Sequence, residues 1–191
     1  MEKNRVRNAK AGALFLSGIA AVALQIPPAS AADYGLGVSH GNDSAVMVPI
    51  RLESLTIEPE VSYSRSKSKG ESDTGSINST FTSYGIATGI YARRTLGPSF
   101  ESYFGGRVGI SKFRISSDSG ATFSFQQKGD LWFAGPAVGL EYYFSKQFSI
   151  ALDASLLYDH SKNKFTAGLT DQSSTSKSVD TATRMLLRGY F

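Results

Sequence analysis

From residue 34 onward, apolar and polar residues alternate along short segments, and clusters of Ser, Gly, Asn and Asp separate these segments. Alternation is typical of β-strands, because successive side chains of an extended chain point to opposite faces. The pattern predicts an all-β chain with strands at residues 34–39, 45–52, 55–65, 83–94, 100–115, 131–144, 148–161 and 179–191. Pro49, Pro59 and Pro136 fall within these strands, where each removes a backbone donor, so we expect bulges or strand ends there.

Each predicted strand has an apolar face and a polar face. In residues 148–161 the even-numbered positions begin with an apolar series: Phe148, Ile150, Leu152, Ala154, Leu156 and Tyr158. The odd-numbered positions of the same segment include Ser149, Asp153 and Ser155. Alternation alone does not tell which face points into a barrel, and a soluble, lipocalin-like barrel would bury the apolar one.

Three features favour an apolar face that points outward into a membrane. Glycine recurs on the polar face, where it makes room inside a narrow barrel. Trp132 and Phe144 mark the two ends of an apolar face and lie about 30 Å apart, close to the apolar band of a membrane barrel with its aromatic girdles. Charges on that face occur near its ends, at Arg65, Arg94 and Lys112, where long side chains reach the headgroups. We therefore predict an eight-stranded, antiparallel, up-and-down transmembrane β-barrel.

The connections between the predicted strands alternate in length. Residues 53–54, 96–99 and 145–147 form tight turns, whereas residues 66–82, 116–130 and 162–178 form longer polar loops, and only 41–44 is short on that side. Membrane barrels of bacterial outer membranes have short periplasmic turns and longer external loops. We therefore expect the segments around Gly70 and Ser174 to be extracellular and the turn at Gly97-Pro98 to be periplasmic.

The first 31 residues have the three parts of a secretory signal. Much of the formal net charge of +4 comes from basic residues near the start: Lys3, Arg5, Arg7 and Lys10. The apolar stretch at residues 11–24 is too short for a spanning helix, which needs about 20 residues. Ala29 and Ala31 fit a signal-peptidase site, with Ala32 as an alternative last residue. We expect residues 1–31 to be removed and residues 32–191 to form the barrel, and the basic balance then gives no support for nucleic-acid binding.

The last predicted strand ends in Arg-Gly-Tyr-Phe and alternates up to the terminal Phe191. With the signal peptide and the eight alternating segments, this ending resembles the small OmpX/OmpA-like outer-membrane β-barrel family. The resemblance implies a non-enzymatic, monomeric protein of the bacterial outer membrane, in contact with outer-membrane lipid and lipopolysaccharide. It also implies that Phe191 closes the signal read by the barrel-assembly machinery during insertion.

The polar face carries charges of both signs in equal numbers. The basic residues are Arg51, Arg93, Arg107, Arg184 and Arg188, and the acidic ones are Glu58, Glu60, Glu101, Glu141 and Asp153. Eight strands enclose only enough space for side chains, and buried charges must pair. We expect an interior ionic network, with Arg184 and Arg188 neutralising Glu141 and Asp153. A charged conduction path is the alternative.

Candidate chemistry is sparse. The chain has no cysteine, and its two histidines are His40 and His160. His160 is followed by Ser161, but adjacent strand residues point to opposite faces, whereas a base and a nucleophile must meet within hydrogen-bond reach. We therefore expect no catalytic residue, no metal site and no cofactor.

The most favoured function is envelope integrity, or surface interaction and adhesion through exposed loops with a host or cell-surface ligand. A narrow channel for small solutes and, with less support, a lipid A-modifying enzyme remain as alternatives.

Overall fold

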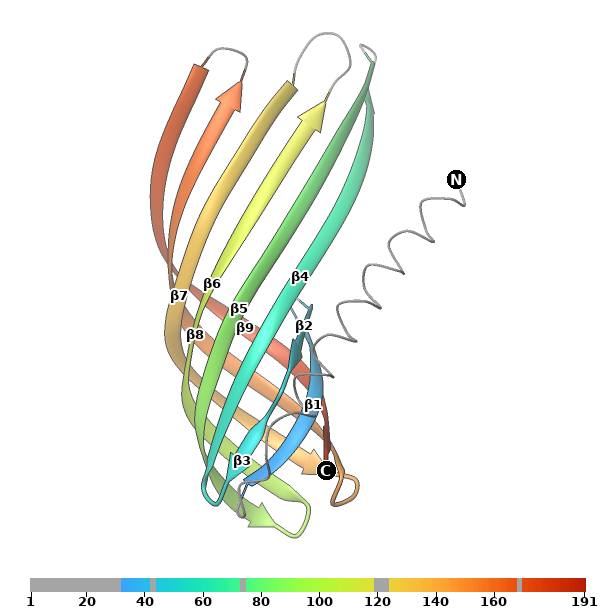
Figure 1. Cartoon of the computed structure of the whole chain (residues 1–191), viewed down its shortest axis with the longest axis vertical. Coiled ribbons are helices and arrows are strands. Elements are labelled where there is room, and N and C mark those ends of the chain that lie inside the picture. Colours follow the sequence, from blue (N-terminus) through green and yellow to red (C-terminus); the bar gives the residue numbers. More distant parts are fainter. Residues whose placement is uncertain (1–31, 42–43, 73–74, 119–123, 168–169) are drawn as a thin grey trace. The chain divides into compact units, whose positions relative to one another are not determined.

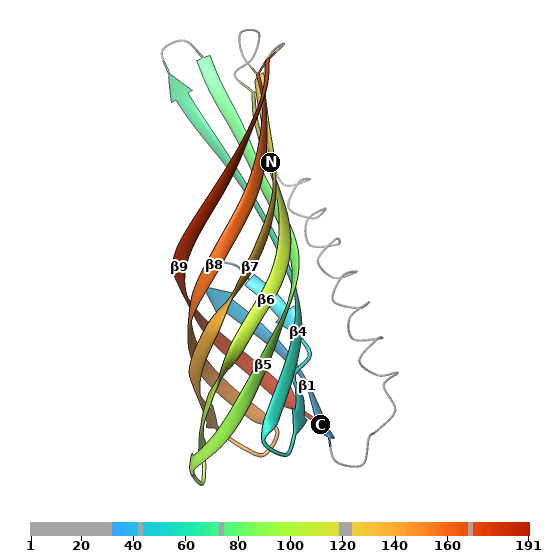
Figure 2. The same ribbon diagram turned by 90° about the vertical axis from the view of Figure 1, so that its left-hand side faces the viewer.

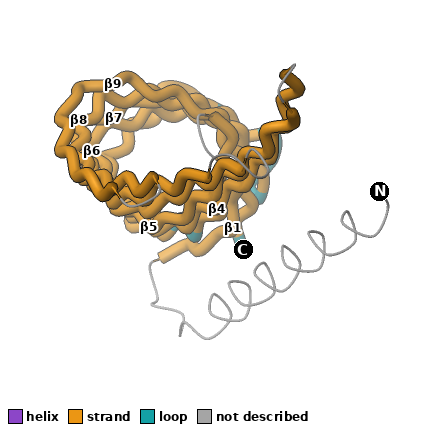
Figure 3. The backbone as a smooth tube through the Cα atoms, turned by 90° about the horizontal axis from the view of Figure 1, so that it is seen from above, coloured by secondary structure: helices purple, strands orange, loops and turns teal. Residues whose placement is uncertain are grey.

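The computed structural model describes residues 32–41, 44–72, 75–118, 124–167 and 170–191. This part of the chain consists of antiparallel strands: β1 (Ala32–Gly41), β2 (Ser44–Met47), β3 (Ile50–Leu52), β4 (Leu55–Ser72), β5 (Gly75–Gly97), β6 (Phe100–Asp118), β7 (Ser124–Tyr143), β8 (Phe148–Ala167) and β9 (Thr170–Tyr190). From β4 to β9 each strand pairs with the next along the chain, β2 pairs with β1 and β4, and β1 pairs with β9, so the sheet closes into a ring (Figures 1 and 3). No helix among the described residues has the length and apolarity to cross a membrane.

β2 and β3 are two parts of a single predicted strand. Both pair with β4 in one continuous register, since Met47 lies opposite Glu60 and Ile50 lies opposite Ile57. The interruption falls at Val48 and Pro49, where the Val48 N–H donates to the carbonyl of Pro59 at 3.0 Å. Proline has no N–H, so Pro59 cannot return that bond. The barrel is therefore eight-stranded, and its second strand is broken at Val48 and Pro49, opposite Pro59 and Glu58 of β4.

Pro136 interrupts a different ladder. The register between β7 and β8 runs from Phe125 to Ala134, stops, and resumes at Ala137 without a shift. The missing pairs are those of Gly135 and Pro136, whereas Pro136 keeps its position opposite Gly106 of β6. The barrel therefore accommodates Pro49 by a break in the strand and Pro136 by a local loss of pairing with β8, in both places without a bulge.

The register around the ring gives the strand tilt. Following paired residues from Ser62 through β5 to β8 leads to Ser176 on β9, whereas the opposite route through β2 and β1 leads to Leu186. The two ends differ by ten residues, which is the shear of the barrel. With about 3.3 Å per residue and about 4.8 Å between strands, a shear of this size tilts eight strands by about 40°.

The polar face of each strand lines the interior and the apolar face points outward. Glu58 exposes 1% of its surface, whereas Phe104 and Leu152 expose 66% and 64%. Outward aromatic residues gather at two levels: Tyr63, Tyr84, Trp132 and Tyr158 at one, and Phe100, Tyr142, Phe144 and Phe148 at the other. From Phe148 to Tyr158 the tilted strand rises about 25 Å, the height of the apolar band of a membrane barrel. The barrel is therefore built to cross a membrane.

The expected long loops are instead strands. The described residues of the segments 66–82, 116–130 and 162–178 continue the hairpins β4–β5, β6–β7 and β8–β9, and β4 pairs with β5 up to Ser72 and Gly75. The loop prediction was wrong because Ser, Thr and Lys suggested solvated turns, while these residues also alternate and pair well outside the membrane. β4 to β9 thus extend far beyond β1–β3 (Figures 1 and 2).

The short β1–β2 hairpin leaves a gap in the upper wall of the barrel. Its pairing ends at His40 and Ser44, while β2 reaches β4 only as far as Ser62 and β1 reaches β9 only as far as Arg184. Above these points, the pairings of the described residues leave β4 with β5 alone and β9 with β8 alone. Two unpaired strand edges, at 63–72 and 170–183, therefore flank the gap.

Candidate functional site in the barrel interior

All the predicted interior charges lie on inward positions, but they form two clusters. The central cluster holds Arg107, Arg184, Arg188, Glu58, Glu60, Glu141 and Asp153. The second cluster holds Arg51, Arg93 and Glu101 and lies at the end with the tight turns; we call it the periplasmic cluster, after the orientation expected from the sequence. Both lie below the β1–β2 hairpin tip. We call the two clusters together the ionic plug.

Arg184 joins three strands in the central cluster. Its Nε and Nη2 bind both carboxylate oxygens of Asp153, at 3.1 and 2.5 Å, in a bidentate pair between the neighbouring strands β9 and β8. Its Nη1 donates to Glu60 of β4 at 2.6 Å, and Arg107 of β6 pairs with the other oxygen of Glu60. Planar guanidinium groups suit such shared, charge-assisted contacts.

Arg188 lies lower and is 2% exposed. Its Nε and Nη2 both donate to one oxygen of Glu58, at 2.9 and 2.6 Å, and its Nη1 lies 3.2 Å from Glu141. Glu141 also accepts hydrogen bonds from Ser149, at 2.5 Å, and from Tyr190, at 2.9 Å. The structure thus brings Arg188 to Glu141 and Arg184 to Asp153, and it adds Glu58 as a partner of Arg188 and Glu60 as a partner of Arg184.

The periplasmic cluster is built around Glu101. Arg51 donates to both of its oxygens at 2.9 and 3.0 Å, Arg93 donates at 3.2 Å, and Tyr143 at 3.0 Å. The Arg51 guanidinium also lies over the rings of Tyr143 and Tyr190, at 5.1 and 4.8 Å from their centroids, within cation–π range. Arg93 further donates to the carbonyl of Glu53 at 2.7 Å, which ties the cluster to the β3–β4 turn.

Each cluster carries a small excess charge of opposite sign. The central cluster has three arginines and four carboxylates, whereas the periplasmic cluster has two arginines and one carboxylate. The two together are neutral, so neither sign is left uncompensated inside the barrel. An interior packed with paired side chains supports the structural network and gives no support to an open conduction path.

Buried tyrosines in the lumen were missed by the sequence analysis. Tyr91 and Tyr103 are 1% and 3% exposed, and their rings lie 5.2 Å apart. Glycines make room for these two rings: a Cβ on Gly139 would lie 2.3 Å from the Tyr103 ring, and one on Gly89 would lie 2.4 Å from the Tyr91 ring. Tyr91 and Tyr103 have odd residue numbers, as do the inward-facing glycines of the same strands. This shared parity could have placed both tyrosines in the lumen from the sequence.

The two histidines lie apart from the plug. His160 stacks on Trp132, with ring centroids 5.7 Å apart, and Ser161 points to the other face of β8. His40 contacts Ser44 through its Nδ1 at 3.2 Å. The described residues contain no group of three His, Cys, Asp or Glu side chains that could hold a metal ion.

Basic side chains form a belt on the outer face, directly beyond the upper aromatic girdle. They occupy the same outward positions as the apolar residues below them and are all exposed: Arg65, Lys67, Lys69, Lys112, Arg114, Lys128, Lys162, Lys164 and Lys177. Asp130 lies among them and pairs with Lys112 at 3.4 Å. We call this set the basic belt; the sequence analysis noted only Arg65 and Lys112 of it.

Comparison with known proteins supports the fold. No family model and no curated protein matches the chain. A major outer membrane protein from Thermus thermophilus matches with a TM-score of 0.55 and 11% identity, over 84% of this chain and 100% of that one. The fold is that of an outer-membrane β-barrel. Two further solved structures match with lower TM-scores. Neisserial surface protein A has a TM-score of 0.45 and 15% identity, over 84% of this chain and 94% of that one. Outer membrane protein H from P. aeruginosa has a TM-score of 0.48 and 13% identity, over 83% of this chain and 99% of that one.

Other parts of the sequence interpretation stay predictions. The finer resemblance to the OmpX/OmpA-like family is one of them, because no family model matches. Ala29 and Ala31 lie outside the described residues. The N–H of Phe191 donates to the carbonyl of Tyr34 at 3.0 Å and its side chain is 70% exposed, a geometry in which the terminal residue closes the ring beside β1.

Proposed function

We propose that the protein is a non-enzymatic, monomeric barrel of the bacterial outer membrane that strengthens the outer leaflet by binding phosphate-bearing headgroups. The observation that carries this proposal is the position of the basic belt. The upper aromatic girdle marks the level of the membrane interface. The belt begins at this level, with Lys112 opposite Tyr84 and Arg65 at the next outward position after Tyr63. Lysine and arginine at this level face the phosphates of the outer-leaflet lipids.

The interior supports a structural rather than a transport role. The ionic plug fills the lower half of the lumen with paired charges, which hold opposite walls of the barrel together. A rigid barrel that presents cations to neighbouring lipids bridges their phosphates, and this bridging reduces the repulsion between anionic headgroups. Each cation near an anionic surface contributes about 1 kcal/mol to the attraction.

A lipid-exchange experiment tests the proposal. The barrel is placed in nanodiscs of phosphatidylcholine, with or without lipid A, and its thermal unfolding is measured. We expect lipid A to raise the free energy of unfolding, and Lys67→Gln/Lys162→Gln to remove about 2 kcal/mol of that gain. A matched pair on the periplasmic side, Arg94→Gln/Lys146→Gln, should keep the gain.

Equal loss in both double variants would contradict a specific role of the basic belt. In cells, deletion of the gene should increase sensitivity to detergent, and the belt variant should restore resistance less well than the periplasmic pair does.

Surface interaction is the second candidate. The hairpins β4–β5 and β8–β9 extend well beyond the upper girdle, and residues 170–181 of β9 are exposed on both faces. A host-surface binding assay with and without the gene tests this candidate, and a phenotype in binding but not in detergent resistance would favour it over envelope integrity.

A further inference from the structure

The lumen changes character above the ionic plug. A cavity of about 170 Å³ lies there, with Arg107, Arg184 and Glu60 of the plug among its lining residues. Leu131, Phe133 and Leu157 contribute an apolar wall. The apolar character continues upward along inward positions, where Phe81 and Phe113 stack at 6.3 Å and Phe125 and Phe165 lie 5.4 Å apart.

The inward aromatic side chains above the ionic plug lie in a part of the barrel that is open on one side. The upper hairpins project beyond the membrane, so these side chains are only half-buried and face an interior that the gap between β4 and β9 leaves open. The inward positions of β4 and β9 at this height are rich in serine. Half-buried aromatic side chains lining a concave surface are typical of a ligand site.

The gap leads to the cavity. Ser62 is the last residue of β4 that pairs with β2, Ala182 lies just above the end of the β1–β9 pairing, and both line the cavity. Tyr63 of the upper girdle follows Ser62 directly, so the opening begins at the level of the membrane interface. A molecule at this interface therefore has a sideways route to the apolar wall.

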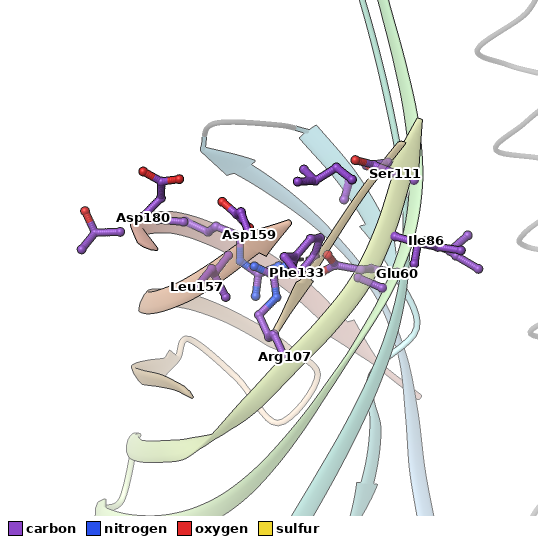
Figure 4. Close-up of a pocket in the computed structure, with 17 residues that line it drawn as sticks. Glu60, Ile86, Arg107, Ser111, Phe133, Leu157, Asp159 and Asp180 are labelled. Atoms are coloured by element: carbon purple, nitrogen blue, oxygen red, sulfur yellow. Dashed lines mark hydrogen bonds and ion pairs between the residues drawn. The ribbon is translucent and has the colours of Figure 1, made fainter. Parts of the chain in front are cut away.

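Charge restricts what can enter. On the inward positions above the plug that the structure describes, the charged side chains are Asp159 and Asp180. Both line the cavity and lie above Arg107 in Figure 4. Carboxylates at these positions disfavour an anionic group in the cavity.

We propose that this cavity binds the apolar tail of a small single-chain amphipath with an uncharged or cationic head. An apolar protein cavity of about 150 Å³ holds a molecule of the size of benzene, so the cavity takes a tail segment of roughly six carbons. The head lies beside Asp159 and Asp180, and the gap admits the molecule from the side.

Fluorescence quenching tests the proposal, because the chain has a single tryptophan, Trp132, which faces outward. Trp132→Phe/Phe133→Trp moves the reporter into the cavity, where an indole keeps the contact that Phe133 makes with Arg107, at 5.6 Å. The probes are 8-bromooctanol, 8-bromooctylamine and 8-bromooctanoate, whose bromine quenches tryptophan on contact. The unmodified protein, with Trp132 in contact with lipid, reports simple partitioning.

We expect the alcohol and the amine to quench the cavity reporter saturably, at concentrations at least tenfold below those needed with the carboxylate. Ala182→Phe, which fills the cavity beside the gap, should remove the saturable part, whereas the outward Ala134→Phe should leave it. Asp159→Asn/Asp180→Asn should bring the carboxylate probe close to the alcohol. Leu157→Trp in the Trp132→Phe background provides a second reporter if the first variant does not fold.

Three results would overturn the proposal or a part of it. Linear quenching of the cavity reporter, equal to that of Trp132, would mean that the probes only partition into lipid. Saturable quenching that Ala182→Phe leaves unchanged would place the binding elsewhere. Equal binding of all three probes would refute the assignment of the head to Asp159 and Asp180.

Discussion

Arg188→Leu is the most informative test of the ionic plug. Arg188 is 2% exposed and supplies Glu58 with two hydrogen bonds, while Glu58 is itself 1% exposed. Without Arg188, the nearest cation to Glu58 is Arg184, whose Nη2 is 3.9 Å from it. Glu141 keeps its donors Ser149 and Tyr190 but loses its ion pair. Removing one partner of a buried pair costs about 3–5 kcal/mol, since a charge is left uncompensated.

The assay is urea unfolding of the barrel in detergent or lipid, followed by circular dichroism. With a slope of about 2 kcal/mol per molar urea, the loss lowers the midpoint by about 2 M. Arg93→Leu is the matched control, because Glu101 keeps both hydrogen bonds from Arg51 and the one from Tyr143. We expect this variant to cost about 1–2 kcal/mol.

A double-mutant cycle separates the ion pair from general loss of packing. Glu58→Leu/Arg188→Leu removes the pair together, so its cost should be about 2 kcal/mol below the sum of the two single variants. A wild-type midpoint for Arg188→Leu, or strictly additive costs in the cycle, would refute the view that these charges hold the barrel walls together.

Three further predictions concern packing, topology and assembly. Gly139→Val should cost about 1–3 kcal/mol in urea unfolding, because a Cβ there lies 2.3 Å from the Tyr103 ring, whereas Gly70→Val, with nothing within 4 Å, should cost about 0.5 kcal/mol at most. A cysteine at Ser173 should react with a membrane-impermeant maleimide on intact cells and one at Ser99 should not; the reverse result would invert the topology. Deleting Phe191 should reduce the amount of folded barrel in cells several-fold and leave refolding in detergent almost unchanged; normal cellular levels would argue against an assembly signal.

Strand number and facing could be predicted from the sequence because both depend on local alternation. A side chain's face follows from its parity, so Asp153, Arg184 and their lumenal neighbours could be assigned without a partner strand. The same rule explains the apolar outer face, where Leu152 is 64% exposed. The same parity places interior tyrosines such as Tyr91 in the lumen, but the sequence analysis used aromatic residues only as markers of the two girdles.

The height of the hairpins could not be predicted in the same way. Serine, threonine and lysine occur in solvated loops and also on strands that stand outside a membrane, so composition does not separate the two. What decides is pairing: the two arms align Ser66 with Phe81 and Ser68 with Ser79, so the facing edges of β4 and β5 pair along their described length. The gap beside β4 follows from the contrast between these long hairpins and the short β1–β2 hairpin.

Partners within the ionic plug depend on the closure of the ring. The pair of Arg184 with Asp153 follows from the register of two neighbouring strands and was within reach of sequence reasoning. The contacts of Arg184 with Glu60 and of Arg188 with Glu58 cross the lumen from β9 to β4, and their heights match only once β1 has paired with β9 at a shear of ten residues. Shear is a property of the closed sheet that no single strand encodes. A sequence of alternating strands therefore specifies which charges face inward, and the closed barrel then decides which of them neutralise each other.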